Sequence, residues 1–125
     1  MDREKFKMLF KNCKKGGCQT YDNYDAIDII KKSIKYDGNT KKQIIAIEEM
    51  AELQKELTKE LRGESPFDFY GMLEEISDVY ICLKALQLIF DISDADISDG
   101  IDIKLNRMAI HNAGNFIKEV EGTHE

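Results

Sequence analysis

Apolar residues recur at three- and four-residue intervals through most of this chain, and that spacing constrains the fold more than any other feature. Helices bury stripes with this period, whereas a half-buried strand alternates apolar and polar residues. No alternating run is long enough for a strand, and Pro66 is the only proline among 125 residues. The sequence therefore predicts an all-α fold: a small helical bundle of four to five helices.

Glycines and capping residues predict where the helices end. We expect Asn39 or Thr40 to cap the third helix and Gly63 to end it in the left-handed conformation. An acidic segment, residues 91–99, is expected to hold caps or a short turn. The expected helices are 3–11, 24–36, 40 or 41 to 62, 67–90, and 101 to 114 or 120. We expect one domain over 24–120, preceded by an N-terminal extension (1–23) and followed by a disordered tail (121–125).

The composition of the chain limits the classes of partner that it is expected to bind and the compartment in which it is expected to work. The net charge of −6 argues against a general nucleic-acid or membrane-surface binder, because both need a basic face. The first ten residues lack the apolar core of a secretory signal, and no apolar run reaches the roughly 18–20 residues of a membrane span. Three cysteines, Cys13, Cys18 and Cys82, predict reduced thiols and a cytoplasmic location. A zinc half-site at Cys13 and Cys18 is a weaker alternative.

Two acidic clusters stand inside the third and fourth expected helices. The first is the segment Glu48-Glu49-Met50-Ala51-Glu52, and the second is Glu75-Ile76-Ser77-Asp78. Residues three apart share one face of a helix, and like charges so placed destabilise it mildly. In both helices the carboxylates border the apolar stripe instead of lying opposite it. Their repetition on two consecutive helices therefore predicts a cation between them.

The apolar stripes place these acids on a common side. In the third helix the stripe runs from Ala46 to Leu61, and in the fourth it runs from Phe69 to Phe90. In the last helix, Lys104 and Arg107 flank the stripe Ile101, Leu105, Met108 at a similar angle. Acids from two helices and bases from a third are thus expected to face a shared site.

The ligand types indicate which cation. Carboxylate oxygens suit Mg²⁺ or Mn²⁺, and the clusters contain no Glu-x-x-His motif of the kind that di-iron bundles use. The competing interpretation is that these glutamates form an ordinary solvated helix face. A calcium loop over residues 94–105 is rejected, because Asp99 replaces the required glycine and Leu105 replaces the final glutamate.

The same residues resemble a known family. The pattern EExxE, followed by 22 residues and ExxD, is similar to the signature of the all-α NTP pyrophosphohydrolases of the MazG-like superfamily. Gln43, Arg62-Gly63 and the segment Lys104-Leu105-Asn106-Arg107 agree with it. The resemblance covers about residues 34–110 and is greatest to the short, single-domain proteins of phages and Firmicutes. Residues 1–23 lie outside it.

The resemblance implies a reaction and a division of roles. It implies Mg²⁺-dependent hydrolysis of nucleoside triphosphates, with deoxynucleotides expected, to the monophosphate and pyrophosphate. One carboxylate would orient or deprotonate the attacking water, with Glu48 considered first and Glu52 second. The implied metal ligands are Glu49, Glu52, Glu75 and Asp78; the implied phosphate ligands are Lys104 and Arg107; Gln43 and Asn106 are weaker candidates for base or sugar contacts.

The resemblance also implies a homodimer or homotetramer, and the long apolar stripes agree with it. Two alternatives stay open. One keeps the fold and changes the substrate, as in the related phosphoribosyl-ATP pyrophosphohydrolases. The other is a non-catalytic helical module that binds a partner or a nucleotide without turnover.

Overall fold

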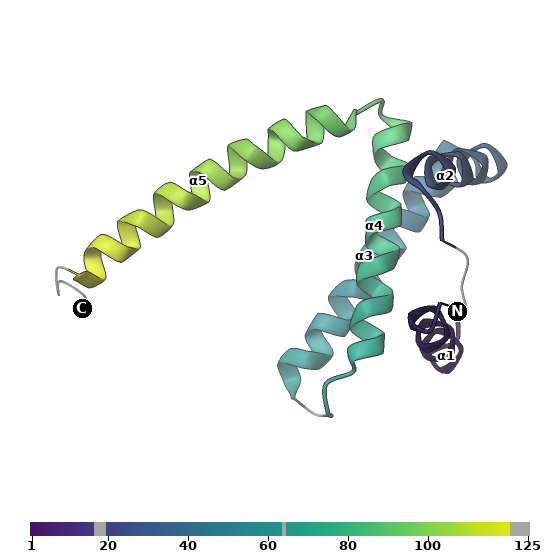
Figure 1. Ribbon diagram of the computed structural model, residues 1–125, viewed down its shortest axis with the longest axis horizontal. Coiled ribbons are helices and arrows are strands. Elements are labelled where there is room, and N and C mark those ends of the chain that lie inside the picture. Colours follow the sequence, from purple (N-terminus) through teal and green to yellow (C-terminus); the bar gives the residue numbers. More distant parts are fainter. Residues whose placement is uncertain (17–19, 64, 121–125) are drawn as a thin grey trace. The chain divides into compact units, whose positions relative to one another are not determined.

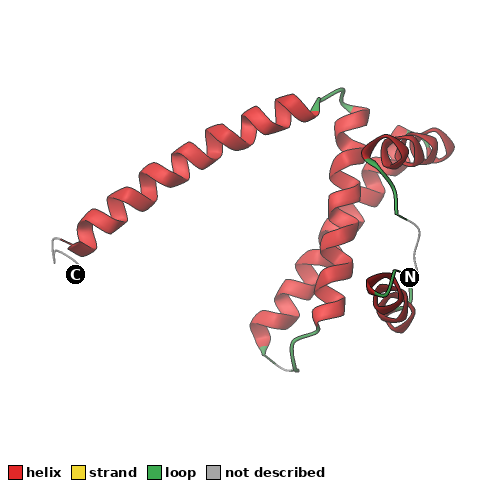
Figure 2. Cartoon of the chain, in the orientation of Figure 1, coloured by secondary structure: helices red, strands yellow, loops and turns green. Residues whose placement is uncertain are grey.

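The structure is a computed structural model that describes residues 1–16, 20–63 and 65–120. Within these residues it has five helices and no strand, so the predicted all-α class is confirmed (Figures 1 and 2). The helices fall into two compact units, Met1–Phe90 and Asp91–Glu125, which are described separately. The helices are α1 (Arg3–Lys14), α2 (Asn23–Asp37), α3 (Asn39–Arg62), α4 (Phe69–Ile89) and α5 (Asp94–Val120).

The centre of the first unit is the pair α3 and α4, which pack against each other (Figure 1). Ala46 on α3 and Ala85 on α4 are buried, and their small side chains allow the two backbones to approach closely. Helix α2 packs on both α4 and α3, and α1 packs on α4. The N-terminal segment, which lies outside the family resemblance, is therefore part of this bundle over Arg3–Lys14.

The helix ends agree with the sequence in part. Gly63 ends α3 with φ 64°, as predicted for a left-handed C-terminal residue. The expected side-chain cap of α3 is wrong, because Gly38 stands at the cap position and makes no side-chain hydrogen bond. Helix α4 begins two residues later than expected, because the Asp68 carboxylate accepts a hydrogen bond from the Gly71 amide at 2.9 Å.

Helix α5 corrects the prediction for the acidic segment. It begins at Asp94, seven residues before the expected start. The hydroxyl of Ser93 accepts a hydrogen bond from the Asp96 amide, and the Asp96 carboxylate accepts one from the Ser93 amide, both at 3.0 Å. This reciprocal capping makes the acidic residues the first turn of a helix, where negative charge is favourable.

The apolar stripe predicted for α3 is only partly buried. Ala46 is 1% exposed, but Leu57 is 47% exposed and Leu61 is 86% exposed. Glu56, which directly precedes Leu57, is only 8% exposed. The single chain thus leaves the C-terminal end of the predicted stripe uncovered, while Glu56 on the neighbouring side of α3 is buried and paired with Arg3.

The structure bears on two predictions drawn from composition, one about membrane-spanning segments and one about the cysteines. Among the described helices, none has a stretch long and apolar enough to span a membrane. Cys13 is disulfide-bonded, so the expectation of three reduced thiols is wrong for this residue, while Cys82 is free. A sulfur held in a disulfide is not a thiolate ligand, which removes the zinc half-site. Cys18, its other proposed member, lies outside the described residues, and the cytoplasmic location stays a prediction.

Candidate metal centre

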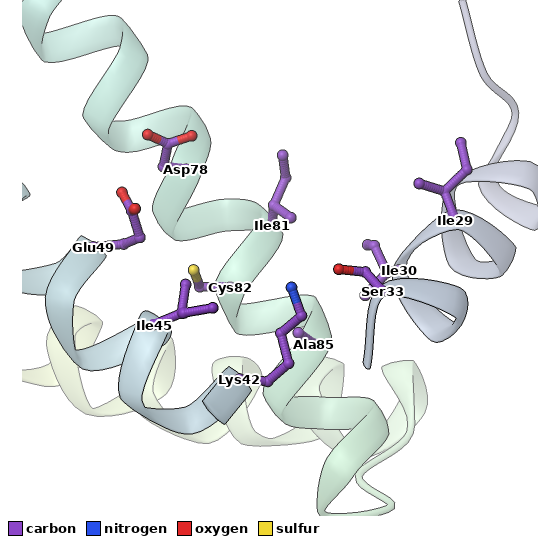
Figure 3. Close-up of a pocket in the computed structure, with 10 residues that line it drawn as sticks. All are labelled: Ile29, Ile30, Ser33, Lys42, Ile45, Glu49, Asp78, Ile81, Cys82 and Ala85. Atoms are coloured by element: carbon purple, nitrogen blue, oxygen red, sulfur yellow. The ribbon is translucent and has the colours of Figure 1, made fainter. Parts of the chain in front are cut away.

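Three carboxylates from the two acidic clusters meet between α3 and α4. Glu49 comes from α3, and Glu75 and Asp78 come from α4. One oxygen from each lies within 4.8 Å of an oxygen from the other two. Figure 3 shows the Glu49 and Asp78 side chains directed toward each other across the two helices. The i,i+3 spacing on α4 brings Glu75 and Asp78 to one face, and the packing of the two helices brings Glu49 to both.

The electrostatics of this group are those of crowded like charges. The pKa of Glu49 is raised above its ordinary 4.5, first by burial and then by the charge of Asp78 and a hydrogen bond with it. The pKa of Glu75 is also raised, by burial and by Asp78, although Arg3 opposes the rise. Both shifts mean that the ionised forms of these two carboxylates are destabilised, and a nearby cation would stabilise them.

The remaining acids of the first cluster are placed differently from each other. Glu52 is exposed, but its charge contributes to the raised pKa of both Glu49 and Glu75, so it lies within electrostatic range of them. Glu48 is exposed and does not belong to the group of three. The structure thus brings together three of the four predicted metal ligands, with the fourth at the edge.

An arginine that sequence reasoning missed lies beside this group. Nη2 of Arg3 is 3.0 Å from Oε1 of Glu56 and 3.4 Å from Oε1 of Glu75, and Nη1 is 3.4 Å from Oε1 of Glu74. Glu74 and Glu75 are each only 7% exposed. A continuous acidic seam therefore runs between α3 and α4, formed by the following residues: Glu49, Asp78, Glu75, Glu74 and Glu56.

A pocket of about 250 Å³ opens next to the metal group, between α2, α3 and α4 (Figure 3). Glu49 and Asp78 form part of its wall, and Cys82 follows one turn along α4. Lys42 supplies a cation, and its Nζ is held 2.8 Å from the Asp37 carboxylate. The rest of the lining is mainly aliphatic: Ile29, Ile30, Ser33, Ile45, Ile81 and Ala85.

The acidic side chains also affect the pKa of a neighbouring cysteine, Cys82. The pKa of its thiol is raised, mainly by burial and then by the negative charges of Glu49 and Asp78, while Lys42 opposes the rise. A thiol with a raised pKa is a poor nucleophile. The structure therefore agrees with Cys82 as a lining residue and not as a reactive one.

Four other residues were predicted for the site: Gln43 on α3, and Lys104, Asn106 and Arg107 on α5. Lys104, Asn106 and Arg107 are exposed on α5, in the second unit, so their role stays a prediction. On α3, the Gln43 amide donates to the Asn39 carbonyl oxygen of its own helix at 3.3 Å. That bond gives Gln43 a local structural role, and a substrate contact is not needed to explain it.

The two cations missed by sequence reasoning differ in how easily they could have been found. Lys42 precedes Glu49 by seven residues, two helical turns, and so shares its face of α3. That spacing was available in the sequence. No local sequence pattern identifies Arg3 as a site residue, because it is 72 residues from Glu75 and contacts it only through the packing of α1 on α4.

The donor set fits a hard divalent cation. It consists of carboxylate oxygens from two helices, half-buried or buried, with pKa values raised by mutual repulsion. Comparisons with protein-family models, curated proteins and solved structures give no match. The argument for function therefore depends on the geometry of the seam and the adjoining pocket.

Proposed function

We propose that this protein is a Mg²⁺-dependent nucleoside triphosphate pyrophosphohydrolase, with Mn²⁺ as an alternative ion. The observation that carries the proposal is the meeting of Glu49, Glu75 and Asp78 beside a pocket that shares two of them. Such a juxtaposition suits a substrate with an organic part and a phosphate chain. The family resemblance of the acidic motifs supports the same reaction.

The roles of the chain's own residues follow from their positions. Glu49, Glu75 and Asp78 would hold the ion, which when bound would neutralise charge on the phosphates. Glu52 lies at the edge of the group and is exposed, so it can reach a water molecule while it stays in the field of the other acids. We therefore assign the orientation or deprotonation of the attacking water to Glu52 in preference to Glu48.

The pocket would take the nucleoside. Its volume of about 250 Å³ lies just below the roughly 300–1,000 Å³ that is common for ligand pockets, so we assign it the nucleoside alone, with the phosphate chain outside at the carboxylates. Aliphatic side chains from α2 and α4 provide surfaces for a base, and Ser33 and Lys42 provide polar contacts. We propose that Lys104 and Arg107 bind phosphates, as the resemblance implies.

We also propose that the working form is a homodimer or homotetramer. Leu57 and Leu61 are exposed on α3, and α5 exposes a stripe that has no second helix within its own unit to cover it. This stripe consists of Ile97, Ile101, Leu105 and Met108. Large exposed apolar surfaces of this kind usually mark an interface.

The decisive experiment measures pyrophosphate release from a panel of ribo- and deoxynucleoside triphosphates, with Mg²⁺ and with EDTA. We expect Mg²⁺-dependent release of pyrophosphate together with the monophosphate. Asp78→Asn is expected to lower kcat/KM by at least about a hundredfold, because it removes a charged ligand. Glu60→Gln, an exposed acid on the same α3, is the matched control and is expected to leave the rate unchanged.

Two results would contradict the proposal. Orthophosphate release would show cleavage at a different bond, and unchanged activity in Asp78→Asn would remove the metal centre from the mechanism. Phosphoribosyl-ATP belongs in the same panel, because its selective hydrolysis would keep the site and change the substrate.

A further inference from the structure

Part of the acidic seam already has a cation, and that cation belongs to the protein. Arg3 contacts Glu56, Glu74 and Glu75 at 3.0, 3.4 and 3.4 Å, and all three carboxylates are buried. Glu75 is also a member of the metal group with Glu49 and Asp78. One carboxylate is therefore shared between the guanidinium and the proposed ion.

The charges explain why Arg3 is needed. Three buried carboxylates without a cation would repel one another and lose their hydration, which is costly in the folded state. Arg3 supplies one positive charge and contacts all three, and Lys59 adds a second cation at Glu56 alone, with its Nζ 3.5 Å from the same Oε1. Among the described residues these three carboxylates are not grouped closely enough to hold an ion, so Arg3 and the proposed ion meet at Glu75 alone and compete for its negative charge.

The residues around Arg3 hold its side chain and its helix in position. Gly71 on α4 leaves room for it, since a β-carbon at that position would lie 2.9 Å from Nη1 of Arg3 and even closer to the Asp68 carboxylate. Nη1 also donates to the Tyr70 carbonyl oxygen at 3.4 Å. Further along α1, the Phe10 ring packs edge-on against Tyr70, with ring centroids 6.0 Å apart. Aromatic packing therefore seats α1 independently of the ion pairs.

We propose that Arg3 sets the affinity of the metal centre. Its guanidinium neutralises part of the charge of Glu75 and so weakens the binding of a divalent ion at Glu49, Glu75 and Asp78. While α1 is docked, the ion is confined to the side of Glu75 that faces Glu49 and Asp78. This inference rests on the proposed function for the existence of that ion.

The test counts Mn²⁺ ions bound by the full chain, using calorimetric titration together with the electron paramagnetic resonance signal of free Mn²⁺. The wild-type protein is expected to bind one ion per chain. Arg3→Gln is expected to bind this ion at least about tenfold more tightly, because a competing positive charge is gone. Lys5→Gln removes the same charge from an exposed position on α1 and is expected to match the wild type.

Two further variants keep the test decisive if Arg3→Gln does not fold without metal. Arg3→Gln with Glu56→Gln has the net charge of the wild type and one buried carboxylate fewer, and it is still expected to gain Mn²⁺ affinity. Phe10→Ala leaves Arg3 in the chain and weakens the seat of α1 on Tyr70. It is expected to move Mn²⁺ binding in the same direction by a smaller amount.

The outcomes separate this inference from the proposed function. One Mn²⁺ ion with unchanged affinity in wild type, Arg3→Gln and the double variant would overturn the inference and leave the metal centre standing. Weaker binding in Arg3→Gln would also overturn it, because it would show that Arg3 supports the ion and does not compete with it. No Mn²⁺ binding by any of the proteins would overturn both the inference and the metal-dependent function.

Discussion

Nη2 of Arg3 lies 3.0 Å from Oε1 of Glu56, so the third residue of the chain neutralises an acid in the middle of the α3–α4 pair, 53 residues away. The same guanidinium reaches Glu75, which belongs to the metal group. The balance of charge along this seam controls both folding and metal binding, and it leads to the following predictions.

The stability of the metal-free protein should depend on pH through Glu49. Its raised pKa means that the folded state holds the proton more tightly than the unfolded state. The contribution of Glu49 to stability is therefore fully present below the ordinary pKa of 4.5 and is lost as the pH rises through the raised pKa. Glu49→Gln should stabilise the protein in EDTA, by an amount that is larger at about pH 8 than at about pH 4.

Urea unfolding at the two pH values checks this prediction. Asp25→Asn is a suitable control, because Asp25 is exposed on α2 and lies outside the seam. A gain for Glu49→Gln that is the same at both pH values would show that the carboxylate carries no penalty in the folded state.

Mg²⁺ should stabilise the folded protein. An ion that binds the folded state adds about 2.7 kcal/mol at a concentration one hundred times its Kd, which corresponds to roughly 10 °C in Tm for a chain of this length. Asp78→Asn should lose most of this shift, because it removes one of the three grouped carboxylates. Thermal unfolding with Mg²⁺ and with EDTA gives the measurement, and an equal Tm shift in Asp78→Asn would place the ion elsewhere.

Gly71→Ala should destabilise the protein, although alanine is normally the better helix former. The new β-carbon would overlap the Asp68 carboxylate and press on Nη1 of Arg3, so we expect a cost of about 1–3 kcal/mol. Gly100→Ala on α5 is the matched control. Nothing lies within 4 Å of its new β-carbon, so helix propensity predicts a gain of about 0.5–1 kcal/mol.

Urea unfolding followed by circular dichroism measures both glycine variants. Stabilisation in Gly71→Ala would mean that Arg3 does not occupy the space above this glycine.

Cys82 should react slowly with iodoacetamide, because burial and the charges of Glu49 and Asp78 raise the pKa of its thiol. Glu49→Gln removes one of these charges and should increase the alkylation rate at a fixed pH. Peptide mapping of the unreduced protein isolates Cys82 from the other cysteines. A bound nucleotide should protect the thiol, since Cys82 lines the pocket, and full reactivity in the presence of saturating nucleotide would argue against the pocket as the nucleoside site.

Filling the pocket should separate nucleotide binding from metal binding. Ser33→Phe places a ring on the α2 side, opposite the carboxylates in Figure 3. We expect KM for the nucleotide to rise by at least about tenfold while the affinity for Mn²⁺ is unchanged. Tyr36→Phe, an exposed position on the same helix, should alter neither value. A loss of Mn²⁺ affinity in Ser33→Phe would show that the two sites are not separable.

The helical architecture could be predicted from the sequence because its signals are local. Apolar periodicity identified each helix, and Gly63 marked the end of α3 with the expected positive φ. Caps were expected within residues 91–99, but the start of α5 was placed at 101 instead of Asp94 because the capping pair itself was not identified. The pair Ser93 and Asp96 fits a helix-capping pattern, and that signal was present in the sequence.

The site was predictable only where its members lie on the same turn or on facing helices. The i,i+3 spacing identified Glu75 and Asp78, and the parallel pattern on α3 identified Glu49. The burial of Glu56 and Glu74 could not be predicted, because it depends on an arginine from α1 that covers them. Residues so far apart in the sequence form no periodic pattern from which their contact could be predicted.

The position of Arg3 in the first turn of α1 has a practical consequence for anyone preparing this protein. Any foreign segment joined directly ahead of α1 lies next to the arginine that contacts the acidic seam. A polyhistidine tag placed there would carry metal-binding imidazoles and extra bulk to the helix whose docking sets the charge of the seam. Ion stoichiometry measured on such a fusion would report on the tag as well as on the protein, so a cleavable tag, removed before titration, is the appropriate design.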